Sequence, residues 1–251
     1  MEHIIFVIGE PIPQIPHPRS VRFVGCQSPP DHRLSIGYYH NLGAQLAESE
    51  WIMKLDVDAF PNRAYFSELL GILDKAGPKE WFNGGMFYVN QASSARFLSS
   101  PGPELLSVAN YLRITRSIDI HCSLTYKAPA ATNFICRREN YLKLGGCDQR
   151  FLGYGWEDYQ QIYMLERYQR GQDPLPGTID MANVSERCRD EISRPKAREL
   201  IRRNEMLGLL HHWHPGSKDP TYKSPKILQH NRQVLLDYVL RARLITNCEG
   251  V

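Results

Sequence analysis

The chain has 251 residues, which suits one α/β domain with embellishments better than two domains. Its hydrophobic content of 42% and charged content of 23% are ordinary for a globular protein with a buried core. The formal net charge of +3 is too small to indicate a nucleic-acid-binding protein, although it is compatible with a small anionic ligand.

The first quarter of the chain predicts alternating strands and helices. Strands are expected at 4–8 and 21–24, with a proline-rich loop between them. A helix is expected at 35–49, and a strand at 51–55 that runs directly into Asp56-Val57-Asp58. This order suits an open α/β sheet that binds its ligands at the strand ends.

The rest of the chain continues the alternation. Helices are expected at 62–76, 138–144, 157–170, 196–207 and 225–245, and strands at 82–89, with a Gly84-Gly85 break, and at 131–137. Residues 92–103 are rich in Ser, Pro and Gly and predict an exposed loop, as do residues 171–195. Residues 104–127 show no clear pattern.

The sequence shows no secretory signal or membrane-spanning segment. The apolar run at 4–8 is much shorter than the roughly 20 residues that a spanning helix needs. The six cysteines include no CxxC pair, which predicts reduced thiols and no zinc site. We therefore expect either a bacterial cytoplasmic enzyme or a trimmed piece of a longer protein. The cysteines are Cys26, Cys122, Cys136, Cys147, Cys188 and Cys248.

The first chemical motif is Asp56-Val57-Asp58, at the end of an apolar strand. Two carboxylates one residue apart can face one cation, and their hard oxygen ligands suit Mg²⁺ or Mn²⁺. Such an ion can stabilise a diphosphate as it leaves. The alternative is an ordinary surface turn, because Asp-x-Asp is a common tripeptide.

The second motif is Gly153-Tyr154-Gly155-Trp156-Glu157-Asp158. Its glycines allow the backbone to approach a ligand closely, and its aromatic rings offer flat faces to a sugar. One of its carboxylates could accept a proton from an acceptor hydroxyl. The alternative is that the two acidic residues simply favour the N-terminus of the following helix.

The third motif is His211-His212-Trp213-His214-Pro215, with three histidines in four residues. His211 and His214 are three positions apart and could reach one site on a tight turn. Imidazole is an acceptable ligand for Mn²⁺. The alternative is a partly buried polar turn with one hydrogen-bonded histidine.

Two basic helices leave their roles open. The helix expected at 196–207 most simply has a solvated face, although its basic residues could contact a diphosphate. The helix expected at 225–245 is amphipathic and basic, which is typical of core packing at a domain end and also of contact with an anionic membrane surface. Peripheral contact with the inner face of the cell membrane therefore stays an alternative.

The three motifs, in this order, carry a family resemblance. The stretches that carry it are 40–44, 51–58, 132–136, 141–148, 153–158 and 211–215. Together they resemble the GT-A glycosyltransferases, and in particular the β-1,4-galactosyltransferase C-terminal region and bacterial capsule-polymerase transferases of the chondroitin-synthase type. The resemblance covers roughly residues 34–70 and 130–215.

This resemblance implies an α/β protein of the GT-A (nucleotide-diphospho-sugar transferase) fold, with a central, mostly parallel sheet flanked by helices. It implies one catalytic domain over residues 1–251. Within that domain, residues 1–90 would bind nucleotide and metal, residues 91–215 would form the acceptor-side and catalytic part, and residues 216–251 would form a C-terminal helical extension.

The resemblance also implies roles for individual residues. Asp58 would bind the metal directly, and Asp56 would contact either the metal or the donor ribose. His214 would complete the metal site, with His211 as a helper. Asp158 would be the catalytic base.

The remaining implied roles concern the donor and the acceptor. Glu157 would orient the acceptor, and Asn41 and Trp156 would contact the donor. Asn133, Tyr154 and Gly155 would bind the acceptor, with Tyr154 at the place where the galactosyltransferases have an acceptor-stacking tryptophan. The family's opening loop that holds the nucleotide base is not evident, and the strand at 4–8 could replace it compactly.

The resulting hypothesis is an inverting, metal-dependent glycosyltransferase. It would move a hexose or N-acetylhexosamine from a UDP-sugar to a hydroxyl of a glycan or lipid-linked oligosaccharide acceptor, in bacterial surface polysaccharide synthesis, with Mn²⁺ or Mg²⁺ as cofactor. The alternatives are a retaining transferase on the same fold, a nucleotide-sugar-binding protein without turnover, and a metal-dependent hydrolase.

Overall fold

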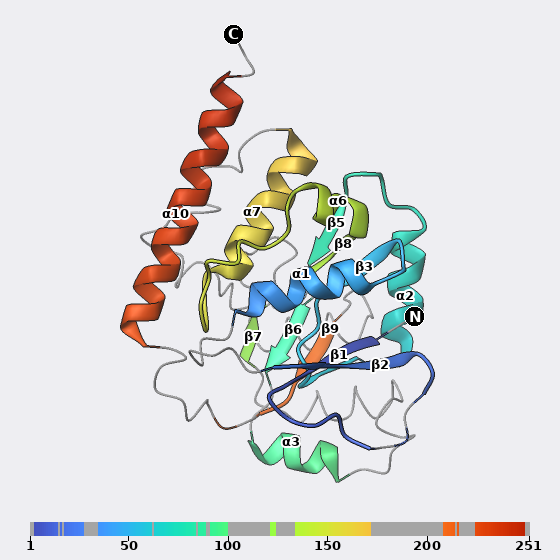
Figure 1. Ribbon diagram of the computed structural model, residues 1–251. Helices are drawn as coiled ribbons and strands as arrows, with labels where there is room; N and C mark the ends of the chain where they lie inside the picture. Colours follow the sequence, from blue (N-terminus) through green and yellow to red (C-terminus); the bar gives the residue numbers. More distant parts are fainter. Residues whose placement is uncertain are drawn as a thin grey trace. The chain divides into compact units, whose positions relative to one another are not determined.

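The computed structural model describes residues 3–14, 16, 18–27, 35–61, 63–83, 85–88, 91–99, 121–123, 134–171, 208–213, 215 and 224–248 (Figure 1). The chain divides into two compact units, and each unit is built from separate stretches of sequence. The first unit comprises Met1–Ile52, Cys136–Pro174 and Ser217–Val251, and the second comprises Met53–Ile135 and Leu175–Gly216.

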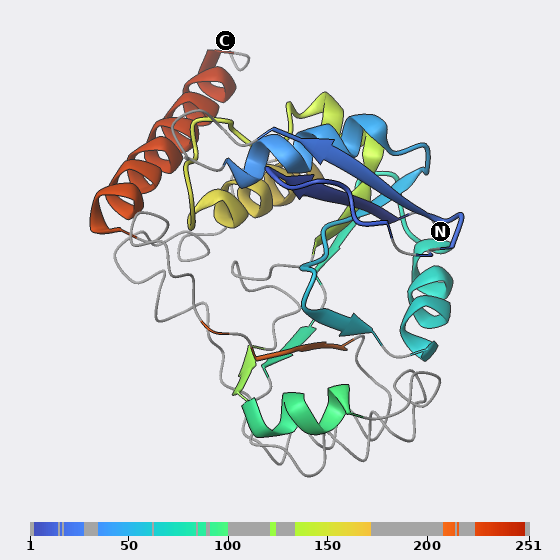
Figure 2. The ribbon, with the colours of Figure 1, turned by 60° about the horizontal axis from the view of Figure 1, so that its bottom comes forward.

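The first unit begins with two parallel strands, β1 (His3–Ile8) and β2 (Val21–Cys26). They lie side by side in Figure 2 and pair from His3 opposite Val21 to Ile8 opposite Cys26. Gly9 follows β1 with a φ of 74° and donates its N–H to the Cys26 carbonyl at 2.9 Å. Both strands that the apolar runs predicted are confirmed.

Helix α1 (Ile36–Leu46) also belongs to the first unit, and Ser35 caps it by accepting the Tyr38 N–H. Its last carbonyls are satisfied by arginines: Arg22 donates to Leu46 O at 2.7 Å, and Arg138 donates to Ala44 O at 2.7 Å. Arg138 is the first residue of α6 (Arg138–Lys143), so these bonds fasten α1 to both β2 and α6.

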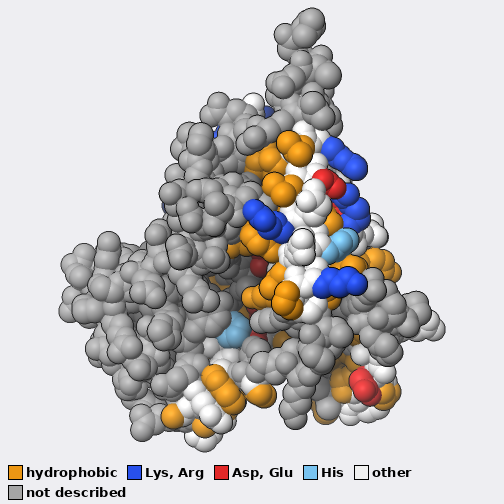
Figure 3. All heavy atoms as spheres, turned by 90° about the vertical axis from the view of Figure 1, so that its left-hand side faces the viewer, with side chains coloured by type: hydrophobic (Ala, Val, Ile, Leu, Met, Phe, Trp, Pro, Cys, Tyr) orange, Lys and Arg blue, Asp and Glu red, His pale blue; other side chains and the backbone are white. Residues whose placement is uncertain are grey.

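Helices α7 (Glu157–Arg170) and α10 (Pro225–Cys248) pack against each other in the first unit (Figure 1). Ile162, Tyr163 and Leu165 of α7 are buried, as are Val234 and Leu235 of α10. The outer face of α10 mixes Lys and Arg with apolar side chains (Figure 3). Both helices were predicted, and their packing accounts for the amphipathic pattern of α10.

The second unit contains a four-stranded sheet in the order β4 (Ala59–Pro61), β9 (Gly208–His211), β6 (Gly85–Tyr88), β7 (His121–Ser123). The β4–β9 and β6–β7 pairs are antiparallel, and the β6–β9 pair is parallel. Helices α2 (Arg63–Leu73) and α3 (Gln91–Leu98) belong to the same unit.

Three further strands form a sheet in the order β3 (Trp51–Met53), β8 (Phe134–Arg137), β5 (Trp81–Asn83). The chain passes from one unit to the other within β3 and again within β8. The described strands thus form three small sheets, of which the β1–β2 pair is parallel and the four-stranded sheet is mixed. A single mostly parallel central sheet stays a prediction.

Several sequence predictions need correction. The prediction of a loop at 92–103 is wrong for residues 92–98, because helix α3 occupies Gln91–Leu98. Its Phe97 is buried, and its Ser94 hydroxyl accepts the Trp213 N–H at 2.8 Å, so tertiary contacts outweigh a composition typical of loops.

Other corrections concern strands. The strand expected at 51–55 ends at Met53. The strand expected at 82–89 is divided at its predicted glycine break into β5 and β6, which lie in different sheets. Strands β4 and β9 were not predicted, because three or four residues carry no measurable alternation. The helix expected at 196–207 lies outside the described residues, as does all but the first residue of the loop expected at 171–195.

Candidate active site

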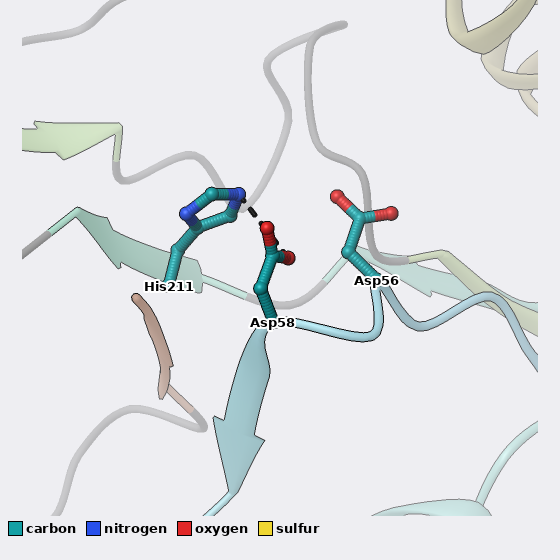
Figure 4. Close-up of side chains that lie close together, drawn as sticks. All are labelled: Asp56, Asp58 and His211. Atoms are coloured by element: carbon teal, nitrogen blue, oxygen red, sulfur yellow. Dashed lines mark ion pairs between the residues drawn. The ribbon is translucent and has the colours of Figure 1, made fainter. Parts of the chain in front are cut away.

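Asp56, Asp58 and His211 converge in the second unit (Figure 4). One ligand atom of each lies within 4.8 Å of those of the other two, and His211 Nε2 is 3.4 Å from Asp58 Oδ1. All three side chains are half-buried, whereas Val57 between the carboxylates is 93% exposed. The two carboxylates therefore share one side of the chain and Val57 takes the other.

Backbone hydrogen bonds place these residues. A turn after β3 closes with Ala59 donating its N–H to Asp56 O at 3.0 Å, so β4 begins immediately after Asp58. Strand β4 pairs antiparallel with β9, which sets Ala59 opposite His211. His212 then donates its N–H to Asp58 O at 2.9 Å. The register of one short strand pair thus brings together residues about 150 positions apart in the sequence.

His212 anchors this arrangement from the protein interior. Only 6% of it is exposed, and its ring lies 5.3 Å from the Phe60 ring and 4.8 Å from the Phe97 ring, centroid to centroid. Because successive side chains of an extended chain point to opposite sides, His211 faces the carboxylates while His212 enters the core. Burial lowers the pKa of His212, so its ring is neutral near pH 7.

The chemistry of the cluster fits a divalent metal ion. Two carboxylate oxygens and one imidazole nitrogen are a donor set that Mn²⁺ accepts, and two carboxylates alone suit Mg²⁺. Ligand atoms at about 2.1 Å from one ion lie at most about 4.2 Å apart. The ligand atoms of the three side chains lie within 4.8 Å of one another, so small side-chain rotations would bring all three into contact with one ion.

The loop at 152–156 of the first unit precedes α7 and carries three residues with positive φ. They are Gly153 (58°), Gly155 (98°) and Trp156 (76°), and Trp156 is the N-cap residue of α7. A left-handed conformation at a residue other than glycine costs roughly 1–3 kcal/mol and persists only where the surroundings impose it. Trp156 is the one such residue among those the structure describes.

The side chains of this loop differ in accessibility. Tyr154 is 42% exposed, and Trp156 is half-buried with its ring 5.5 Å from that of Tyr159. Glu157 is only 4% exposed, whereas Asp158 is half-buried. Of the two adjacent carboxylates, Asp158 is therefore the more accessible to a ligand.

A family model described as "Glycosyltransferase like family 2" matches residues 22–232. The chain belongs to this family. The match spans Asp56-Val57-Asp58, the 153–158 motif and the histidines at 211–215, so this family 2 protein is a glycosyltransferase of the GT-A type. Members of the family commonly use a divalent metal ion and a nucleotide sugar. No curated protein matches the chain.

In this family 2 glycosyltransferase, the buried Asn41 of α1 hydrogen-bonds to Tyr141 and Cys147. Its Oδ1 accepts the Tyr141 hydroxyl at 2.9 Å and the Cys147 N–H at 2.8 Å, and its Nδ2 donates to Cys147 O at 2.8 Å. Gly146 lies against it with a φ of 66°, and a Cβ there would overlap Asn41 Oδ1. These contacts use the polar atoms of Asn41 for structure, so its predicted donor contact has no support from them.

Two predicted site residues of the family 2 glycosyltransferase, His214 and Asn133, lie outside the described residues. Within the described part of the chain, His211 is the histidine that lies beside the carboxylates, although the family resemblance implied only a helping role for it.

Replacing His212 with alanine is expected to destabilise the family 2 glycosyltransferase by about 2–4 kcal/mol, because a ring between Phe60 and Phe97 is lost and a cavity remains. Urea unfolding followed by circular dichroism measures the change. Val57→Ala is the control: Val57 is 93% exposed beside the same strand pair, so its loss should change stability by no more than about 0.5 kcal/mol. Equal effects of the two variants would contradict the anchoring role.

Proposed function

We propose that the protein is an inverting, Mn²⁺-dependent glycosyltransferase that moves a hexose or N-acetylhexosamine from a UDP-sugar to a hydroxyl of a glycan or lipid-linked oligosaccharide. Bacterial surface polysaccharide synthesis is the proposed setting. The observation that carries this proposal is the meeting of Asp56, Asp58 and His211 in a chain of glycosyltransferase family 2. The likeness to galactosyltransferases and chondroitin-synthase-type polymerases supports an inverting course.

The proposed metal ligands are Asp58 and His211, with Asp56 as a third ligand or a contact to the donor ribose, and with His214 added from the sequence. A bound ion would supply positive charge where the diphosphate leaves. Manganese is preferred over magnesium in the proposal because an imidazole nitrogen belongs to the cluster.

Asp158 is the proposed catalytic base, which takes the proton of the acceptor hydroxyl as that oxygen attacks the anomeric carbon. Its greater accessibility than Glu157 supports this choice. Glu157 is proposed to orient the acceptor from within the protein. Tyr154 and Trp156 are proposed to offer their rings to the sugars, and Gly155 to contact the acceptor through its backbone.

The nucleotide base is proposed to bind at the carboxyl ends of β1 and β2. A hollow of about 440 Å³ there is lined by Gly9, Glu10, Gly25, Cys26 and Gln27. Open α/β sheets bind ligands beyond the carboxyl ends of their strands, and these two strands are parallel. The Glu10 carboxylate could accept the ring N–H of uracil. The short β1–β2 pair would then take the place of the longer N-terminal segment with which the family binds the nucleotide base.

The proposed place in the cell is the cytoplasm, with peripheral contact at the inner face of the membrane. Among the α10 residues whose exposure the structure describes, Lys226, Arg232 and Arg241 are basic and exposed, and Leu240 is exposed near them. Such a surface favours anionic lipid. Among the described residues, no helix has the length and apolar character needed to span a membrane.

The proposed function is tested by a panel of UDP-sugars incubated with Mn²⁺, with and without p-nitrophenyl glycosides as acceptors. We expect UDP release from one donor that rises at least about tenfold with acceptor and stops when EDTA removes the metal. NMR of the product should show an inverted anomeric configuration.

The other readings predict different results in the same panel. A retaining enzyme would give the donor's own anomer, and a hydrolase would release UDP at a rate independent of acceptor. A nucleotide-sugar-binding protein would bind UDP-sugar without releasing UDP. Any of these three results would contradict the proposed function.

A further inference from the structure

Asn231 of α10 binds the backbone of the loop that precedes α7. It is completely buried, with 0% of its surface exposed. Its Oδ1 accepts the Leu152 N–H at 2.9 Å. Its Nδ2 donates to Leu152 O at 2.7 Å, to Gly155 O at 2.9 Å and to Tyr154 O at 3.3 Å. One amide side chain therefore satisfies four backbone groups, with both of its N–H donors in use.

Two neighbours of Asn231 on α10 touch the same segment. A Cβ added at Gly155 would come within 3.1 Å of Leu228 Cδ2, so α10 packs closely on the backbone there. The His230 Nε2 lies 2.9 Å from Arg150 O. Since Leu228, His230 and Asn231 lie within one turn of the helix, this single turn of α10 supports residues 150–155.

The loop that Asn231 holds is the strained one. Glycine adopts a positive φ at no steric cost, so Trp156 is the residue whose positive φ needs an external constraint. Asn231 bonds to the carbonyls of Leu152, Tyr154 and Gly155, and the last of these belongs to the peptide that directly precedes Trp156. The same loop carries the exposed Tyr154 and sets where α7 begins, at Glu157 and Asp158. The path of the loop therefore sets the direction of Tyr154, which is proposed to bind the acceptor, and of Asp158, which is proposed to accept its proton.

We propose that Asn231 is a positioning residue of the transferase, which holds loop 152–155 so that Tyr154 and Asp158 meet the acceptor. This inference rests on the proposed function. Asn231 touches neither donor nor acceptor in this scheme and acts only through the backbone that it binds. Its loss should therefore affect steps that involve the acceptor and spare those that involve only the donor and the metal.

The test compares Asn231→Ala with Gln229→Ala, which removes an exposed amide from the same helix. Each variant is assayed for Mn²⁺-dependent UDP release without acceptor and with the best p-nitrophenyl glycoside of the wild-type panel. For Asn231→Ala we expect donor hydrolysis within about twofold of wild type. Acceptor-dependent kcat/KM should fall by about 10–100-fold with a higher acceptor KM, because misplacement by about 1 Å can cost about a hundredfold. Gln229→Ala should match wild type in both assays.

Asn231→Asp is the second variant, in case the alanine variant does not fold. It keeps the size of the side chain and the acceptor for the Leu152 N–H, but its carboxylate cannot donate to the three carbonyls. The same selective loss of acceptor-dependent turnover is expected. Equal losses in both assays, unchanged turnover, or failure of both variants to fold at 20 °C would overturn the inference. Failure of the proposed function is distinct, since wild type itself would then show no acceptor-dependent release.

Discussion

Replacing Asp58 with asparagine is expected to lower Mn²⁺-dependent transfer by about 10³-fold. The substitution removes the negative charge of the carboxylate that lies 3.4 Å from His211 Nε2, while the side chain keeps its size. The Asp58 carbonyl that accepts the His212 N–H remains, so the β4–β9 register should survive. Metal stabilisation of a leaving group is worth several kcal/mol, and about 4 kcal/mol corresponds to this factor.

The measurement is kcat/KM for the preferred donor at saturating Mn²⁺, together with the Mn²⁺ concentration that gives half-maximal rate. Asp74→Asn is the matched control, because Asp74 is exposed and lies outside the cluster. Its rate and its Mn²⁺ requirement should equal those of wild type. An Asp58→Asn enzyme with an unchanged Mn²⁺ requirement would show that the carboxylate does not hold the ion.

Replacing Asp158 with asparagine is expected to lower transfer by about 10²–10⁴-fold, the usual effect of removing a general base. Asparagine keeps the shape of the side chain but cannot accept the proton of the acceptor hydroxyl. Because Asp158 is assigned to the acceptor, the Kd for UDP and Mn²⁺ should stay within about twofold of wild type. Steady-state kinetics measures the first effect, and isothermal titration with UDP measures the second.

Glu139→Gln serves as the control for this variant, since Glu139 is an exposed carboxylate in the first turn of another helix, α6. It should leave transfer unchanged. Near-normal turnover in Asp158→Asn would remove Asp158 as the base. Loss of UDP binding together with turnover would instead mean that Asp158 serves the donor side.

The longer elements of the fold could be predicted from the sequence. Helices α1, α7 and α10 carry apolar periodicity, and strands β1 and β2 are short apolar runs. Each of these elements was found close to its expected place. Strands β4 and β9 were missed because they have three and four residues and are stabilised by each other rather than by local pattern. Helix α3 was missed because its composition is polar and its order depends on contacts such as Ser94 with Trp213.

The candidate site was predictable in its parts but not in its assembly. The sequence showed that Asp56, Asp58 and the late histidines could serve a metal. The choice of His211 as the partner of the carboxylates depends on the Ala59–His211 register, which no local signal specifies. The buried ring of His212 follows from the same register, because neighbours in an extended chain alternate in direction.

Asn231 gave no signal in the sequence, because an asparagine within a helix looks like any other polar residue. Only its complete burial and its four backbone contacts mark it as part of the support of the 152–155 loop. The glycines of that loop have positive φ, which their residue type allows, but the positive φ at Trp156 could not be foreseen.

The metal centre is tested most directly by Mn²⁺ binding in the presence of UDP, followed by electron paramagnetic resonance of the free ion. Wild-type protein is expected to remove one Mn²⁺ per chain from solution. Asp56→Asn, Asp58→Asn and His211→Ala are each expected to weaken this binding at least about tenfold, while Asp74→Asn leaves it unchanged. Binding that is equally tight in Asp58→Asn, His211→Ala and wild type would contradict a metal centre formed by these residues.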